Sequence, residues 1–426
     1  MEATKENLKS TIDRNVLGRN SQLIMLAKLI LNLNENVIIS IDGKWGSGKT
    51  FFVKQFIHLI ENIDDFKNGT IENNDKDIFK QLKENNLVVY YNAWENDSHT
   101  NCLESIMYNI LNEYPNQKKQ LVDFNEFKKL IKPFCRDAIY SLSNGFFDIN
   151  NIDKMNSFED LAKDIFTIEE KKIAFKKLID AILGEKQRLL LVIDELDRCK
   201  PTFAVEMLET IKHFYSNPKI TVIVSTNNLE LSNTIRKFYG NDFDGYSYLD
   251  KFYDCIINME IKDIKTYLKN QLSFCQKTYI YHDFSYLIMN YFDFSLRDCN
   301  RFMTLYTMLK NYIEAEPIFK KDKQYIFSCV ILPICLALKI KNISQYNLFV
   351  NNKGEEIIKT FLNDMVDKTH YEGWLKDVIE NDKDDYKEKI IEVYHGIFTD
   401  ETGFYHLPFF EAISLLGTDL LIENED

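Results

Sequence analysis

The segment from residue 43 to residue 50, GKWGSGKT, constrains this chain more than any other feature. It fits the pattern GxxxxGK[ST] and lies between an apolar run rich in β-branched residues, at 36–41, and a largely apolar helical segment at 50–60. Glycines let the backbone close around an anion with its N–H groups inward, and the following helix directs its positive end at the same point. The order strand, loop, helix therefore predicts a polyphosphate-binding loop rather than a glycine-rich turn that caps an ordinary helix.

Two side chains at the end of this loop have the chemistry that a magnesium-bound triphosphate requires. We expect Lys49 to reach the β- and γ-phosphates and to stabilise charge in catalysis, and the Thr50 hydroxyl to complete the Mg²⁺ shell. The residues expected to contact the nucleotide are Gly43, Lys44, Trp45, Gly46, Ser47, Gly48, Lys49, Thr50 and Phe51.

Five short apolar runs have the character of strands that are buried on both faces. They lie at 36–41, 87–92, 188–193, 220–225 and 254–259. Such runs, separated by helical stretches, predict a parallel sheet covered by helices on both sides, which is a three-layer α/β sandwich. The low usage of Gly and Pro, 14 and 7 in 426 residues, also favours a helix-rich α/β chain over an all-β array.

The run at 188–193 leads directly into two adjacent carboxylates, Asp194 and Glu195. A magnesium-bound triphosphate needs a carboxylate that fixes the water shell of the metal, and hydrolysis needs a group that orients or deprotonates the attacking water. We assign the first role to Asp194 and the second to Glu195. The alternative is an acidic surface turn after a strand, and it is disfavoured because a phosphate-binding loop lies upstream in the sequence.

Several motifs, taken in order, resemble the KAP family of P-loop NTPases. They are GKWGSGKT at 43–50, YNAWE at 91–95, DELDRCKP at 194–201, YLDK at 248–251 and SLRDCNRF at 295–302. The resemblance implies a nucleotide-hydrolysing domain of the additional-strand type, with sheet order 5-1-4-3-2 and strand 1 carrying the loop. It also implies ATP as the nucleotide and, because bacterial proteins of this kind are often linked to plasmid or phage conflict, a part in such defence.

In that strand order, the end of the fourth strand faces the γ-phosphate. We choose Asn227 there as a catalytic residue that senses this phosphate or holds the water, and the alternative is a turn and helix cap. Arg297 and Arg301 lie four apart on one face of a helix, from which a lid could neutralise charge on the phosphoryl group. The alternative pairs them with Asp293, Asp298 or solvent. Arg297 is the candidate catalytic residue of the two.

Three further features have two interpretations each. Arg198 is either a finger toward a neighbouring subunit or a brace for Asp197, and the brace is favoured because Arg beside Asp on a tight loop forms a bidentate pair. Trp94 is expected to be a packing residue rather than one that stacks on the base. The segment at 13–19 either lines the adenine pocket or simply begins a helix.

The chain is expected to contain three parts. Residues 1–260 form the nucleotide domain, with a helical insertion at about 100–185, since the connection between the second and third strands is too long for one crossover helix. Residues 261–315 form a helical lid-like subdomain, and residues 316–426 form a helical acidic domain. Of the net charge of −13, the last 64 residues carry −12, from 17 Asp and Glu against 5 Lys. We expect a protein partner or self-association.

A cytoplasmic protein without a membrane span is expected. The longest apolar stretch, 325–338, has 14 residues, fewer than the ~20 that cross a bilayer, and is expected to be a buried helix. The N-terminus is polar, and the eight cysteines show no CxxC pair, as in a reduced compartment. Nucleic-acid binding is not expected because the paired lysines are interspersed with Glu and Asp.

These features predict a Mg²⁺-dependent nucleoside triphosphatase, with ATP favoured, that couples nucleotide binding and hydrolysis to conformational change or assembly. The alternative is a nucleotide-gated switch or scaffold with little turnover. A third interpretation, a kinase acting on a small acceptor, is disfavoured because Glu195 suits activation of water and no acceptor motif is visible.

Overall fold

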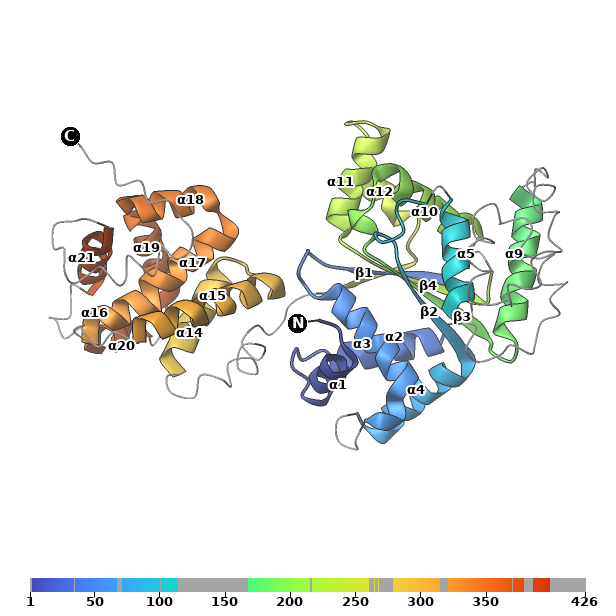
Figure 1. The fold of residues 1–426 in the computed structure, drawn as a ribbon, viewed down its shortest axis with the longest axis horizontal. Coiled ribbons are helices and arrows are strands. Elements are labelled where there is room, and N and C mark those ends of the chain that lie inside the picture. The colour runs from blue at the N-terminus through green and yellow to red at the C-terminus, as the bar shows by residue number, and fades with distance from the viewer. Residues whose placement is uncertain are drawn as a thin grey trace, which may run out of the picture. The chain divides into compact units, whose positions relative to one another are not determined.

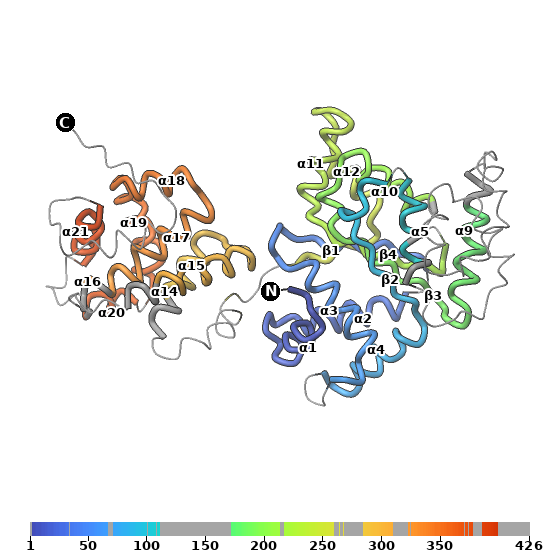
Figure 2. Tube along the Cα trace, in the orientation of Figure 1, coloured from blue at the N-terminus to red at the C-terminus, as the bar shows by residue number. Residues whose placement is uncertain are grey.

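A computed structural model of the chain consists of two compact units, residues 1–260 and 261–426. The structure describes residues 2–33, 35–66, 71–99, 101–113, 168–214, 217–259, 264, 267, 279–314, 321–369, 371–378 and 386–398 (Figure 2). The insertion expected at about 100–185 is therefore described at its two ends only. Residues 399–426 of the acidic tail also lie outside the described residues.

Five strands form one parallel sheet in the first unit (Figure 1). They are β1 (Val37–Asp42), β2 (Asn86–Asn92), β3 (Arg188–Asp194), β4 (Ile220–Thr226) and β5 (Cys255–Asn258). Their order across the sheet is β2-β3-β4-β1-β5, and each neighbouring pair is parallel. The expected α/β fold and the expected order 5-1-4-3-2 are confirmed.

The register of the sheet brings the polar ends of four strands together. Asp42 is opposite Thr226, Ser225 is opposite Asp194, and Asp194 is opposite Asn92. Because all five strands run in the same direction, the loops that follow these residues share one edge of the sheet. In open α/β sheets, ligands bind outside this carboxyl edge.

Helices cover both faces of the sheet (Figure 1). The helices on one face are α1 (Lys5–Asp13), α2 (Asn20–Leu31), α3 (Lys49–Asn62) and α4 (Asn73–Asn85), with the short turn η1 (Ile63–Asp65) after α3. The helices on the other face are α5 (Cys102–Glu113), α9 (Ile168–Leu183), α10 (Pro201–Phe214), α11 (Asn228–Tyr239) and α12 (Gly245–Asp250). In β3, Leu191 packs into one layer and Leu190 into the other, which is why this strand is apolar throughout.

The described parts of the second unit are helical. Its elements are α14 (Tyr279–Tyr291), α15 (Leu296–Glu314), α16 (Lys321–Ile326), η6 (Phe327–Ile331), α17 (Leu332–Lys341), α18 (Ile343–Leu348), η7 (Phe349–Lys353), α19 (Glu355–Phe361), η8 (Leu362–Val366), α20 (Tyr371–Val378) and α21 (Tyr386–Phe398). Both α14 and α15 pack against α17. The separate lid at 261–315 and acidic domain at 316–426 stay predictions.

The apolar stretch at 325–338 is buried, but it is not one regular helix. A π-helical turn, η6, joins α16 to α17. Pro333 lies in the first turn of α17, and a proline has no N–H for the bond to the carbonyl four residues earlier. A widened turn just before the proline is a common way for the backbone to accommodate that loss.

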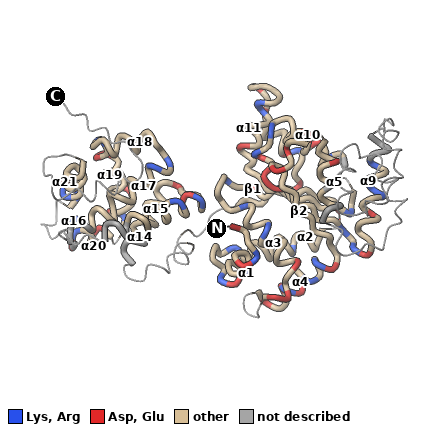
Figure 3. The backbone as a smooth tube through the Cα atoms, in the orientation of Figure 1, with Lys and Arg blue, Asp and Glu red and all other residues tan. Residues whose placement is uncertain are grey.

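Acidic and basic side chains are interspersed on the surface helices of the first unit. Both α1 and α4 carry residues of the two signs (Figure 3). Of the paired lysines, Lys176 and Lys177 lie on α9, whereas the pairs at 118–119 and 128–129 fall outside the described residues. Across the described ranges, the structure contains no helix whose length and apolar character would let it cross a membrane.

Candidate functional site

The loop between β1 and α3 depends on glycine at three points, one of which is Gly46 with a φ of 80°. Gly48 has a φ of 87°, in the left-handed region, and α3 begins at the next residue. At Gly43, a Cβ atom would lie 2.8 Å from Ser47 Oγ and 3.1 Å from Met259 Cβ. The nine residues expected to contact a nucleotide, 43–51, form this loop and the first three residues of α3. The first N–H groups of a helix lack intrahelical partners and are available to an anion.

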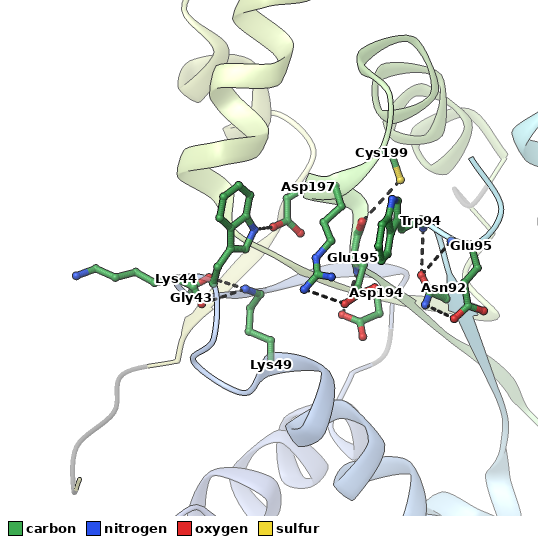
Figure 4. Close-up of polar contacts among 12 residues, drawn as sticks. Gly43, Lys44, Lys49, Asn92, Trp94, Glu95, Asp194, Glu195, Asp197 and Cys199 are labelled. Atoms are coloured by element: carbon green, nitrogen blue, oxygen red, sulfur yellow. Dashed lines mark hydrogen bonds and ion pairs between the residues drawn. The ribbon is translucent and has the colours of Figure 1, made fainter. Parts of the chain in front are cut away.

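Lys49 folds back against the loop (Figure 4). Its Nζ donates to the carbonyl oxygen of Gly43 at 2.6 Å and to that of Lys44 at 3.4 Å, and the residue is only 9% exposed. Burial lowers the pKa of Lys49, whereas the carboxylates of Asp197 and Asp194 raise it. The Lys49 ammonium is therefore a buried positive charge within electrostatic reach of the carboxylates that follow β3.

Asp194 is the last residue of β3, is 1% exposed, and is fixed from two sides. Its Oδ2 accepts from the Tyr90 hydroxyl at 2.9 Å, and its Oδ1 accepts from the Glu195 N–H at 3.0 Å. Burial, and then the charge of Asp194, raise the pKa of Tyr90, so the phenol keeps its proton as a donor. Tyr90 was not among the residues predicted from the sequence; the signal for it was its place two residues before Asn92, on the same face of β2.

Glu195 has a left-handed backbone with a φ of 61°, which ends the strand and begins the short turn η4 (Leu196–Arg198). Such a conformation is strained in a residue other than glycine, by an amount of order 1–3 kcal/mol. Its Oε1 lies 3.1 Å from Arg198 Nη2. Burial raises the pKa of Glu195, the Arg198 charge lowers it, and the charges of Asp194 and Asp197 raise it.

The expectation that Arg198 braces Asp197 is wrong. Adjacent residues in a helical turn do not face each other, whereas residues three apart do, and Arg198 pairs with Glu195 instead. The Asp197 carboxylate accepts from the indole N–H of Trp45 in the phosphate loop. The segment after β3 is thereby tied to the loop after β1.

Trp94, which was expected to be a packing residue, is 50% exposed. The backbone N–H groups of Trp94 and Glu95 both donate to Asn92 Oδ1, at 3.1 Å and 3.3 Å, and this tight turn holds the indole near the surface. The guanidinium carbon of Arg198 lies 5.3 Å from the centroid of the indole ring.

Asn227 and Arg297, the two remaining candidates for catalysis, stay predictions in that role. Asn227 follows β4 and caps α11, with its Oδ1 accepting from the Glu230 N–H at 3.4 Å, so the helix cap considered as the alternative is present. Arg297 lies exposed in the first turn of α15, in the second unit. The neighbouring Asp298 pairs with Lys341 at 3.2 Å.

The segment at 13–19 contributes a contact to the phosphate loop. Arg19 is 5% exposed, and its Nη2 donates to the Ser47 carbonyl oxygen at 2.9 Å. Burial lowers the pKa of Arg19 to about 10, so the guanidinium stays charged at neutral pH. Arg19 Nη1 has no hydrogen-bond partner within the described residues.

Three buried hydroxyls near this edge also lack a hydrogen-bond partner among the described residues. They belong to Ser47 in the loop and to Ser225 and Thr226 at the end of β4. Buried polar groups in folded proteins are nearly always paired. Unpaired donors beside a buried Lys49 fit a ligand that carries several acceptor oxygens, as a polyphosphate does.

Comparison with protein families supports this interpretation of the geometry. A model described as the KAP family P-loop domain matches residues 19–311, which is more than half of the chain. A comparison with curated proteins found no match. The matched range includes the phosphate loop, the acidic end of β3 and the start of α15, and it confirms the resemblance noted in the sequence. The chain belongs to the KAP family of P-loop NTPases and contains its nucleotide-binding domain.

Proposed function

We propose that this chain is a Mg²⁺-dependent ATPase. The observation that carries the proposal is the convergence of Lys49, Asp194 and Glu195 at one edge of the sheet, from the loop after β1 and from the end of β3. The charges of Asp197 and Asp194 act on Lys49 to raise its pKa, although burial, the larger effect, lowers it. Electrostatic stabilisation of a phosphoryl group, a metal-holding carboxylate and an acceptor for the proton of water are the parts that triphosphate hydrolysis needs.

The residues have separate tasks in the reaction. The first N–H groups of α3 and the Lys49 ammonium bind the β- and γ-phosphates and stabilise their charge. The oxygen of water forms a bond to the γ-phosphorus, and the bond from that phosphorus to the bridging oxygen breaks. The electron pair leaves with the β-phosphate of ADP. Glu195 orients the water and accepts its proton, which then passes to solvent.

Magnesium is expected to be held by Asp194 and Thr50 together with the phosphates of the nucleotide. Across the described residues, no group of three or more His, Cys, Asp and Glu side chains could hold a metal by itself. Mg²⁺ is usually bound by one or two carboxylates, water and substrate phosphates, and the buried Asp194 and half-buried Thr50 suit that mode. When bound, the ion neutralises charge on the β- and γ-phosphate oxygens.

Other parts of the proposal rest on the family. Membership favours ATP over GTP, and it favours coupling of hydrolysis to conformational change or assembly, in anti-phage or plasmid-related defence. We also propose that the protein is cytoplasmic and acts with a protein partner or with copies of itself. The alternative function is a nucleotide-gated switch or scaffold with little turnover.

Phosphate release by the intact protein tests the proposed function. We expect turnover with ATP that is abolished by removing Mg²⁺ with EDTA and restored by adding it back. We also expect a higher kcat/KM for ATP than for GTP. Tight binding of ATP without phosphate release would instead support the switch or scaffold. Release that does not depend on Mg²⁺ would contradict the assignment of Asp194 and Thr50.

Replacing Arg19 with alanine should weaken nucleotide binding by about 10- to 100-fold, since a hydrogen bond from a charged group contributes about 1.5–3 kcal/mol. The substitution removes the contact to the Ser47 carbonyl and a buried positive charge beneath the phosphate loop. Titration with a fluorescent ATP analogue measures the change. Arg14→Ala, at an exposed position of the same segment, is the matched control, and equal affinities for the two variants would show that Arg19 has no such role.

A further inference from the structure

We propose that Arg198 is a positioning residue that holds the Glu195 carboxylate of its own chain in place, and that the Trp94 indole is the surface on which Arg198 rests. The inference rests on the proposed hydrolytic function and names two residues that this function does not assign. Two contacts carry it, the ion pair between Arg198 and Glu195 and the stacking of Arg198 over Trp94.

The Arg198 guanidinium is held on two sides. Its Nη2 lies 3.1 Å from Glu195 Oε1, three residues back across the η4 turn, and its carbon lies 5.3 Å from the Trp94 ring centroid. A cation within about 6 Å of an indole centroid is attracted by the ring. The Glu195 side chain is 14% exposed and the Arg198 side chain 29%, so solvent screens this pair less than a surface ion pair.

The position of Trp94 is set from a different strand. Asn92 ends β2, its Oδ1 accepts from the Trp94 N–H, and its Nδ2 donates to Glu95 Oε1 at 2.8 Å. Asn92 is also opposite Asp194 in the sheet register. The guanidinium therefore spans two strand ends, with the indole provided by the segment after β2 and the carboxylate by the segment after β3.

Glu195 needs such a partner because of its neighbours. Asp194 and Asp197 place like charges on either side of it in the sequence, and its left-handed backbone leaves it at the start of a single short turn. A general base must lie within a narrow range of positions relative to the attacking water. The rate of the reaction therefore falls steeply when the carboxylate is displaced. Arg198 offsets the repulsion and fixes one carboxylate oxygen.

Kinetics of four variants test the positioning role. For Arg198→Ala we expect kcat to fall by roughly 10- to 100-fold, while the KM and the nucleotide Kd change by less than about threefold. Arg198→Lys should recover part of the loss. Lysine keeps the positive charge, but it lacks the planar guanidinium that can stack on the Trp94 ring and pair with the Glu195 carboxylate at the same time. Trp94→Ala should lower kcat less than Arg198→Ala does, and Trp94→Phe, which keeps a ring, should stay close to wild type. Equal kcat values for wild type and Arg198→Ala would overturn the proposal.

A spectroscopic measurement tests the geometry without any turnover. In a Trp45→Phe, Trp374→Phe background, Trp94 is the only tryptophan, and Arg198 covers one side of its ring. We expect Arg198→Ala to change the Trp94 emission and to increase its quenching by acrylamide. If the wild type releases no phosphate but this change occurs, the proposed hydrolysis fails while the contact stands. Unchanged emission and quenching would overturn the contact itself.

Mixing two variants separates positioning within one chain from a contribution to a neighbouring subunit. Protein carrying Arg198→Ala is mixed with protein carrying Glu195→Gln, under conditions in which any assembly can exchange subunits. If Arg198 serves Glu195 of its own chain, the mixture has no more activity than the sum of its parts. Activity above that sum would show that Arg198 acts as a finger toward another copy, and would overturn the proposal.

Discussion

Lys49→Ala should lower the affinity of the protein for ATP by on the order of 100-fold, because removing one partner of a buried charge interaction costs about 2–5 kcal/mol. The Lys49 ammonium is the positive charge at the mouth of the phosphate loop, held by the Gly43 carbonyl oxygen and within reach of the Asp194 and Asp197 charges. Without it, the γ-phosphate would approach those carboxylates with one compensating positive charge fewer. Isothermal calorimetry with ATP, or titration with a fluorescent analogue, gives the Kd directly.

The fold of the Lys49→Ala variant should survive. Burial lowers the pKa of Lys49, which means that the charged ammonium costs folding free energy in the absence of a ligand. Removing it relieves that cost, so the thermal midpoint without nucleotide should not fall. Lys28→Ala is a suitable control, since Lys28 is an exposed residue paired with Asp75 at 2.9 Å. Affinity for ATP that is the same in both variants would remove the basis for the phosphate-binding loop.

The sequence predicted the sheet well because apolar runs and the loop pattern depend on residue type alone. The apolar runs located all five strands, and the resemblance to the KAP family implied their order in the sheet, but three of the runs stopped one residue too early, at functionally important points. β1 continues to Asp42, β3 to Asp194 and β4 to Thr226. An apolar run in the sequence ends where the first polar residue follows it. The strand itself continues through that residue, because main-chain hydrogen bonds do not depend on side-chain polarity.

The contacts within the site were harder to predict because they depend on backbone conformation. The left-handed Glu195 begins a turn in which Arg198 faces Glu195 rather than its neighbour Asp197. Trp94 was expected to be a packing residue, but the contact between its ring and Arg198 was not predicted, and the turn around Asn92 leaves Trp94 half exposed. Residue type and spacing singled out Glu195, Trp94 and Arg198, but did not predict which of them would pair.

Glu195→Gln should lower kcat by roughly 100- to 1,000-fold while nucleotide binding stays within about threefold of wild type, since general base catalysis contributes about 10²–10⁴ in rate. Glutamine matches the size of glutamate and keeps a carbonyl oxygen for the Arg198 contact at Oε1. It cannot accept a proton from water. Single-turnover phosphate release measures the chemical step, and equilibrium titration with ATP measures binding on the same samples.

Glu95→Gln is the matched control because it makes the same chemical change at a neighbouring carboxylate, in the segment that follows β2. Glu95 accepts from Asn92 Nδ2, and the proposed reaction does not use the Glu95 charge. The turnover of the Glu95→Gln variant should therefore stay within about twofold of wild type. Loss of turnover in Glu195→Gln alone, with ATP still bound, would identify the carboxylate after Asp194 as the group that acts on water. Full turnover in Glu195→Gln would assign that step elsewhere, and Asn227, at the end of the adjacent β4, would be the next residue to replace.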